Sequence, residues 1–489
     1  MNSVTQRRKF SSGQAMAQPP SAIPRVEATR AVNFRSMYCI ALSLLIYLAF
    51  NFAANGGNGA NRSFLLASAG GLLALAPLVG SEAGRVLGGS KLGLILVIVY
   101  AFNTFAAVGH FLYYIQPDYF SGNTDFVYFW DYMWLDQSLI HVANIWHAGG
   151  LFSPIDAEYW LVNKNAGLLA FMSLNYYVAG SFPLNIVPWN VLFTIYTAIL
   201  ISDMTRNLGG GRQQVSLALW VTLLLPFTFI ASLMWRDTTG QFFIVLGAYL
   251  MVLTRSRKGY WVLLLPAASF LAYLHREPYL VIFFVAAILY FLHDMRHSKH
   301  APVLVPLGIL LLIALVPIAQ QLSSVAFHRY SDADGSSAIG LMVSSGRVLG
   351  LPFRVIRAIL GPFPWTGYSQ QVDGYAYQPF EYLQSVLNLT MLVCALPLAW
   401  RLWKIKNELD LCTLLALIFF VMAVISTGIH TSYTSVGLTL LVPQMTRVGA
   451  DQFLKTFGAS LLFFIAANII VVGMGFSGLN IMQNLSGGY

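Results

Sequence analysis

Three aspartates stand close together in GNTDFVYFWDYMWLDQ, a stretch that also holds six aromatic residues: Asp125, Asp131 and Asp136. A carboxylate in such a stretch can act as a general base on a hydroxyl group. It can also bind a divalent cation such as Mg²⁺ or Mn²⁺, which would neutralise a leaving phosphate. The aromatic side chains, Tyr128 and Trp130 among them, can anchor at a membrane interface or stack on sugar rings. The alternative for each aspartate is a solvated loop position without a catalytic role.

Basic residues gather in a second stretch, SSGRVLGLPFRVIRAILGPFPW, where Arg347, Arg354 and Arg357 are spaced by seven and three. If 345–360 is helical, the three side chains share one face and the opposite face is apolar. This pattern is typical of an amphipathic helix that lies in a membrane interface. Three guanidinium groups on one face could bind a diphosphate, because their planar geometry matches phosphate oxygens. Contact with lipid head groups is the alternative.

Two short turns each place an arginine beside a carboxylate: Arg236 beside Asp237, and Arg276 beside Glu277. Where a helix meets water, such pairs are usually snorkelling side chains and local ion pairs that stabilise the fold little. The functional alternative is that both turns line the same cavity as the three arginines of the second stretch.

Histidines and cysteines do not form a metal-binding pattern. His141 and His147 are six residues apart, which does not place them on one helical face. The cysteines, Cys39, Cys394 and Cys412, fall in separate apolar stretches. We therefore expect small packing residues there, and neither a zinc site nor a disulfide framework.

Composition indicates which elements must position these residues. Of the 489 residues, 57% are hydrophobic and only 10% are charged, whereas soluble chains carry about 25% charged residues. Repeated apolar stretches of about 18 residues or more indicate a polytopic helical membrane protein. We therefore predict an all-α fold with about 13 transmembrane helices, in a range of about 12 to 14. They form a single domain, 37–489, after a disordered basic cytoplasmic tail, 1–36.

The transmembrane helices are predicted from apolar stretches alone. They are expected at 37–54, 63–80, 92–115, 184–203, 214–234, 240–254, 259–274, 278–293, 301–320, 381–400, 411–429, 431–446 and 457–476. The apolar stretch 166–182 is short for a full span and either re-enters the membrane or lies at its interface.

Orientation follows from the positive-inside rule. With the N-terminus in the cytoplasm, most of the 28 Lys and Arg residues fall on the cytoplasmic side, and this bias accounts for the net charge of +9 without any nucleic acid. Two long extracytoplasmic loops remain, about 116–165 and about 321–380, and both are expected to carry interfacial helices. The first contains the aspartates and the second contains the arginines. The two arginine–carboxylate turns lie on the same side.

This layout resembles the GT-C superfamily of polytopic glycosyltransferases, which use polyprenyl-phosphate-linked sugars. GNTDFVYFWDYMW looks like the acidic first outer loop of that family, and 179–212 and 223–259 look like its following helices and turns. RVIRAILGPFPW resembles a motif of bacterial surface-polysaccharide proteins, including O-antigen and exopolysaccharide repeat-unit polymerases. The chain departs from those polymerases near its last helices. HTSYTSVGLTLLVPQMTR lacks their Asn-Gly-Thr and basic pair, which leaves His430 as the candidate there.

The resemblance implies a glycosyltransferase of the bacterial inner membrane. Asp125 would deprotonate the acceptor hydroxyl, and the arginines would bind an undecaprenyl-(di)phosphate carrier. The carrier-binding residues would be Arg347, Arg354 and Arg357, assisted by Arg236 and Arg276. Secondary candidates are Asp237, Glu277, Asp131, Tyr128, His141, Trp130, Trp365 and His430. Expected partners are the lipid-linked sugar or oligosaccharide, membrane lipids and other polysaccharide-assembly proteins.

Two other functions remain open at this point. A flippase or transporter of lipid-linked oligosaccharide needs polar or ionisable residues near the bilayer midplane, and often an internal repeat. The predicted spans carry almost no charge in their interiors and no repeat, which favours surface chemistry. An O-antigen-type ligase would use the same kind of site as a polymerase.

Overall fold

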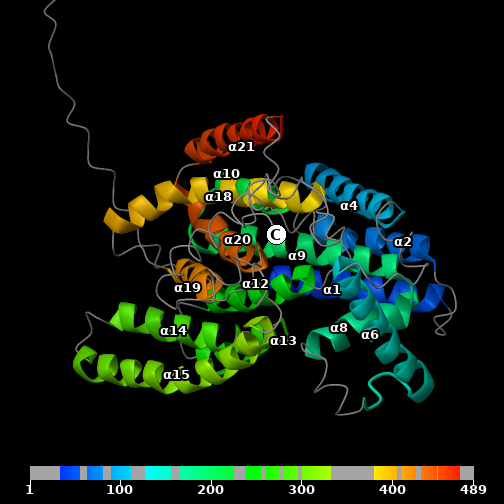
Figure 1. Cartoon of the computed structure of the whole chain (residues 1–489), viewed down its shortest axis with the longest axis horizontal. Helices are drawn as coiled ribbons and strands as arrows, with labels where there is room; N and C mark the ends of the chain where they lie inside the picture. Colours follow the sequence, from blue (N-terminus) through cyan, green and yellow to red (C-terminus); the bar gives the residue numbers. More distant parts are fainter. Residues whose placement is uncertain are drawn as a thin grey trace, which may run out of the picture. The chain divides into compact units, whose positions relative to one another are not determined.

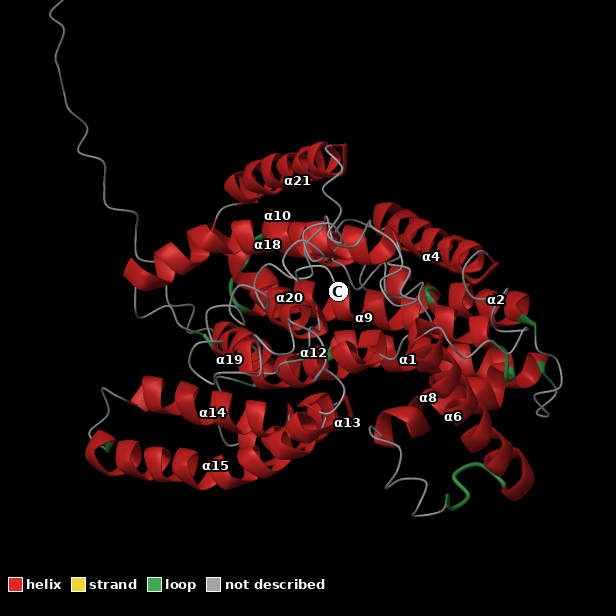
Figure 2. Ribbon diagram, viewed as in Figure 1, coloured by secondary structure: helices red, strands yellow, loops and turns green. Residues whose placement is uncertain are grey.

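The computed structural model describes residues 34–55, 63–80, 90–112, 127–155, 166–224, 237–254, 260–275, 279–295, 300–331, 379–404, 410–425, 431–448 and 450–473. These residues form helices joined by short turns, and none of them lies in a strand (Figure 2). The prediction of an all-α fold is confirmed for this part of the chain. By contacts the chain divides into Met1–Ala31, outside the described residues, and Val32–Tyr489.

Most helices have bounds close to those of the predicted spans. Figure 1 labels these helices. In chain order they are α1 Arg35–Ala54, α2 Phe64–Ala74, α4 Ser90–His110, α6 Val127–Gly149, α8 Ala166–Ala179, the 3-10 turn η2 Pro183–Asn185, α9 Ile186–Asn207, α10 Arg212–Leu223, α12 Asp237–Leu253, α13 Trp261–His275, α14 Tyr279–Met295, α15 Ala301–Ser331, α18 Pro379–Lys404, α19 Leu411–Ile425, α20 Thr431–Val448 and α21 Ala450–Gly473.

Three stretches of the described chain are long and apolar enough to cross a membrane, judged by length and composition: Arg35–Ala54, Lys91–Gly109 and Pro183–Asn207. Shorter apolar helices of 10–17 residues make up much of the rest. The number of about 13 membrane spans stays a prediction.

The helix α9 is enclosed by its neighbours along nearly its whole length. Every residue from Ile186 to Thr205 is buried, and α9 packs against α4, α10, α12 and α20. Aromatic rings fill the space between these helices: the Trp189 ring lies 5.2 Å from that of Phe171, and the Phe193 ring lies 4.8 Å from that of Phe242. A helix that is buried on all sides belongs to a protein core and does not form an outer face.

Consecutive helices pack as neighbours on either side of this core. α12 packs against α13, α13 against α14, and α14 against α15, so that α14 and α15 lie side by side (Figure 1). Gly247 permits the close approach of α12 and α13. A Cβ atom at this position would stand 3.2 Å from the carbonyl oxygen of Ala268 and 3.1 Å from the ring of Phe283.

Large apolar side chains are exposed on several helices. Phe105 on α4 is 81% exposed, Val303 on α15 is 71% exposed and Leu462 on α21 is 70% exposed. Apolar surface on this scale marks a place where an apolar surrounding meets the protein. Together with the three long apolar stretches, these faces fit association with a membrane.

The first predicted outer loop contains a helix, as the sequence analysis expected. α6 forms because Leu135, Leu139, Val142, Ala143 and Trp146 recur at helical spacing, and all five side chains are buried. This face packs against α8. The part of the loop from Val127 to Gly149 is therefore anchored to α8.

The second predicted outer loop begins later than expected. The span predicted to end at residue 320 continues as α15 to Ser331. No glycine or proline interrupts the chain between Pro317 and Gly335. The sequence therefore offers no signal that would end the helix at the predicted boundary.

Candidate functional site

Most of the predicted site residues lie outside the described residues. These are Asp125, Arg236, Arg276, Glu277, Arg347, Arg354, Arg357, Trp365 and His430. Tyr128, Trp130 and Asp131 fall in the first turns of α6, where the backbone is described and the side chains are not. The proximity of Asp125 to the arginines therefore stays a prediction.

Asp237 is the predicted site residue that the structure places most clearly. It is the first residue of α12, directly after Arg236, and it is 8% exposed. A carboxylate in the first turn interacts favourably with the helix dipole. The next polar residues, Thr238, Thr239 and Gln241, are buried as well. The start of α12 is thus a buried polar segment.

Hydrogen bonds join this segment directly to α9 and α20, and through α20 to α18. Thr239 Oγ1 donates to Asn190 Oδ1 on α9, at 3.2 Å. Gln241 Nε2 donates to Thr439 Oγ1 on α20, at 2.7 Å. Ser435, one turn before Thr439, donates from its Oγ to Asn388 Oδ1 on α18, at 3.0 Å. We call these six residues the four-helix polar cluster: Asn190, Thr239, Gln241, Asn388, Ser435 and Thr439.

The spacing of the residues divides this cluster into two halves. Thr239 and Gln241 are two residues apart, so they point to opposite faces of α12. Thr238 and Gln241 are three residues apart and share one face, as Ser435 and Thr439 do on α20. We call the cluster residues on this face, together with Thr238, the polar seam: Thr238, Gln241, Ser435, Thr439 and Asn388.

Two buried atoms of the polar seam find no hydrogen-bond partner among the described residues: Thr238 Oγ1 and Asn388 Nδ2. Thr238 is 1% exposed and Asn388 is 3% exposed. A buried polar atom without a partner costs about 1–3 kcal/mol of desolvation. The seam therefore keeps hydrogen-bonding capacity that the described chain itself does not use.

Comparison of the chain with known protein families, curated proteins and solved structures finds no match. The geometry of this chain is therefore the basis for assigning its site.

Asp136, for which the sequence favoured a solvated loop position over a catalytic role, is buried. It is 6% exposed on α6, and the hydroxyl group of Tyr176 on α8 donates to its Oδ1 at 2.5 Å. Burial is possible because α6 packs on α8 and brings a phenol to the carboxylate. This expectation was wrong, because Asp136 lies on the face of α6 that packs against α8.

The two histidines of α6 have different surroundings. His141 is exposed, whereas His147 stacks on Tyr177 of α8 with ring centroids 4.5 Å apart. Partial burial lowers the pKa of His147 from its ordinary value. Within the described residues, no three His, Cys, Asp or Glu side chains come together as a metal-ligand set.

A second buried carboxylate, Asp203, lies near the opposite end of α9 from Asn190. It is 2% exposed and accepts hydrogen bonds from Ser36 Oγ on α1 at 3.0 Å and from Tyr249 OH on α12 at 2.8 Å. Arg206 Nη1 stands 3.1 Å from its Oδ1. This anchor was not predicted from the sequence. Its signal was an acid inside an apolar span with an arginine three residues later.

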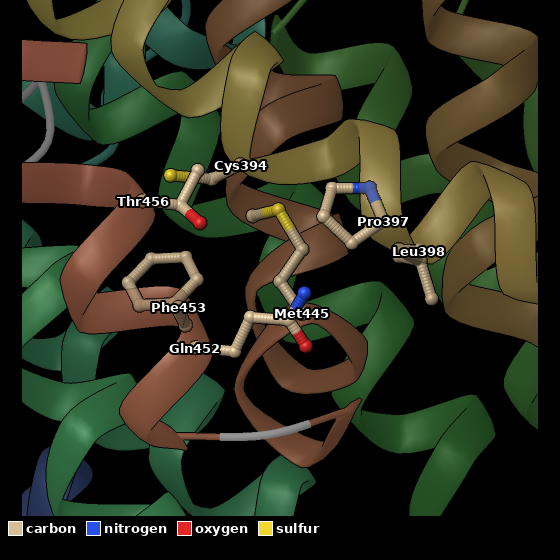
Figure 3. Close-up of a pocket in the computed structure, with 7 residues that line it drawn as sticks. All are labelled: Cys394, Pro397, Leu398, Met445, Gln452, Phe453 and Thr456. Atoms are coloured by element: carbon tan, nitrogen blue, oxygen red, sulfur yellow. The ribbon is translucent and has the colours of Figure 1, made fainter. Parts of the chain in front are cut away.

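A small hollow lies between α18, α20 and α21, lined by Cys394, Pro397, Leu398, Met445, Gln452, Phe453 and Thr456. The side chain of Met445 stands between Pro397 and Thr456 (Figure 3). The hollow has room for about one water molecule. It lies towards the ends of α18 and α20 that face away from the polar seam, so it is not a candidate for the site.

Proposed function

We propose that the chain is an integral membrane glycosyltransferase of the polysaccharide-polymerase kind. It would transfer a sugar or glycan from an undecaprenyl-(di)phosphate carrier to an acceptor hydroxyl at the extracytoplasmic face. Asp125 would be the general base, and Arg347, Arg354 and Arg357 would bind the diphosphate.

The observation that carries this proposal is the four-helix polar cluster. Its members lie near the starts of α12 and α20, near the start of α9 and in the first half of α18. The charge distribution predicts that all four of these helix ends face outside. A group of buried amides and hydroxyls at this level, directly after Arg236 and Asp237, supports binding of a polar ligand beside the outer loops.

The surroundings of Asp203 bear on the competing transporter. A transporter needs ionisable groups that change partners as the protein alternates between states. Asp203 instead has two hydroxyl donors and an arginine around it, which suits an anchor between helices. This favours the transferase over the transporter.

Reconstitution in liposomes with an undecaprenyl-diphosphate-linked oligosaccharide tests the proposal. The wild type is expected to lengthen the glycan, detected by gel mobility or mass spectrometry. Asp125→Asn is expected to slow elongation about 100-fold or more, because it removes the general base. Arg354→Ala is expected to slow it about 10-fold or more, because it weakens stabilisation of the leaving diphosphate.

Matched controls are Asp451→Asn and Arg212→Ala. Both residues are exposed at helix starts, on α21 and α10, away from the polar seam. Both variants should elongate glycan like the wild type. If Asp125→Asn and Arg354→Ala elongate as well as these controls, the site assignment fails. If the wild type moves the lipid-linked sugar across the bilayer without extending it, the protein is a transporter.

A further inference from the structure

We infer that the polar seam is a subsite for an uncharged sugar, separate from the diphosphate-binding arginines. It would bind hydroxyl groups or an acetamido group of a lipid-linked glycan through Thr238 and Asn388. This inference rests on the proposed function and assigns a part of the same site that the sequence did not indicate.

The orientation of Asn388 is the first step. Its Oδ1 accepts the hydrogen bond from Ser435 Oγ, so its Nδ2 points elsewhere. That amide nitrogen is buried and finds no partner among the described residues. A fixed donor without an acceptor selects a ligand that brings an oxygen lone pair, such as a sugar hydroxyl or an acetamido carbonyl.

The position of Thr238 is the second step. Gln241 and Thr439 are hydrogen-bonded across α12 and α20. The charge distribution predicts that both helices run from the outer to the inner side. Thr238 is about one turn before Gln241, and Ser435 is about one turn before Thr439. Thr238 and Ser435 therefore stand at one level, and Asn388 joins that level through Ser435. The two atoms without partners belong to the same layer of the seam.

The charge of the seam is the third step. Its five residues are all uncharged, and the carboxylate of Asp237 directly precedes Thr238. A phosphate group would need cationic partners, and none of the five seam residues supplies one. A hydroxyl-rich or acetamido-bearing ring needs none, so an uncharged sugar is the class of ligand that fits.

Two probes that differ only in the sugar test this inference. Binding to the purified protein in nanodiscs is measured for undecaprenyl diphosphate and for the same lipid carrying N-acetylglucosamine. The wild type is expected to bind the sugar-bearing probe more tightly. Asn388→Leu is expected to weaken binding of that probe about tenfold, and Thr238→Val about fivefold, because each removes about one hydrogen bond. Neither variant should change binding of undecaprenyl diphosphate.

Asn103→Leu on α4 is the matched control. Asn103 is also a buried amide in an apolar helix, but its Nδ2 donates to Val99 O of its own helix. The Asn103→Leu variant should bind both probes like the wild type.

Thr238→Val keeps the shape of the side chain, so it tests the subsite even if Asn388→Leu folds poorly. Equal binding of both probes by the wild type overturns the inference. So does unchanged preference in both seam variants.

The outcomes also separate this inference from the proposed function. If the seam variants lose the sugar preference but the wild type extends no glycan in liposomes, the subsite stands and the transferase fails. If the wild type extends glycan and both seam variants bind and extend like it, the transferase stands and the subsite fails. A structural role alone would lower the melting temperature and weaken both probes together, which also overturns the subsite.

Discussion

At the scale of single residues, packing on a neighbouring helix changes what a polar side chain can do. Asp136 and His147 lie on the same helix, and two adjacent tyrosines of α8, Tyr176 and Tyr177, determine their surroundings. The phenol of Tyr176 holds the carboxylate in place. The ring of Tyr177 covers one face of the imidazole and takes water away from it. Neither effect can be read from the α6 sequence alone.

The lowered pKa of His147 predicts a loss of stability in acid. The folded state favours the neutral imidazole, so the unfolded chain takes up the proton first as pH falls below the ordinary value of about 6.5. The free energy of unfolding should therefore fall between the unfolded and the lowered folded pKa. His147→Phe keeps an aromatic ring against Tyr177 and cannot titrate. Its melting temperature in detergent should depend less on pH than that of the wild type, between about pH 7 and about pH 5.

His141→Phe is the comparison for this measurement, because His141 is exposed on the same helix. If the two variants show the same pH dependence as the wild type, the stacked His147 does not contribute to acid sensitivity.

At the scale of elements, α9 is held at both ends by polar contacts. Asn190 meets α12 near one end, and Asp203 meets α1 and α12 near the other. Between them the contacts are largely apolar and aromatic. These two polar points determine how far each neighbour can slide along α9. Together they keep the start of α12, with its buried polar residues, at a defined height.

Removing the carboxylate of Asp203 is expected to weaken this arrangement. Asp203→Ala should lower the free energy of unfolding by about 3 kcal/mol, because it leaves the partners of a buried charge without an acceptor. Asp203→Asn keeps one oxygen that can accept from both Ser36 and Tyr249, so it should cost less, about 1 kcal/mol. Unfolding by SDS in mixed micelles measures both. Equal stability of Asp203→Ala and the wild type would show that the anchor contributes nothing.

The elements were more predictable than the site. Apolar stretches predicted α12, α14 and α20 to within a few residues, because a long apolar run has few other ways to satisfy its backbone. The polar seam was not predicted, because Asn388, Ser435 and Gln241 lie on three helices distant in sequence. Each is an ordinary polar residue within its own helix. Only the packing of α18, α20 and α12 brings them together in one seam.

At the scale of the whole molecule, the exposed apolar faces and the distribution of basic residues together predict how the chain is oriented in a membrane. α4, α15 and α21 expose large apolar side chains, and basic residues gather in the connections assigned to the cytoplasm. A bilayer would cover the exposed apolar side chains. By the positive-inside rule, the basic connections would lie on its cytoplasmic side. The catalytic proposal depends on this orientation, because it puts both long loops outside.

Single introduced cysteines can test the orientation. The three native cysteines are buried, so the background labelling should be low. Gly122→Cys, in the first long loop, should react with a membrane-impermeant maleimide in intact cells. Gln213→Cys, exposed at the start of α10, should react only after the membrane is opened. The reverse pattern would place the aspartate-containing loop in the cytoplasm and remove the basis of the proposed site.

The enclosure of α9 has a consequence for how the protein is made. If α9 spans the membrane as predicted, it would enter before α12 and α20 have been synthesised, yet it carries Asn190 and Asp203, whose partners include side chains of α12. Until α12 arrives, these groups would face lipid or the walls of the insertion machinery. α9 should therefore stay beside that machinery until α12 emerges. It would then be released into the lipid later than the helices that precede it in the chain, although it is the most completely buried helix among them.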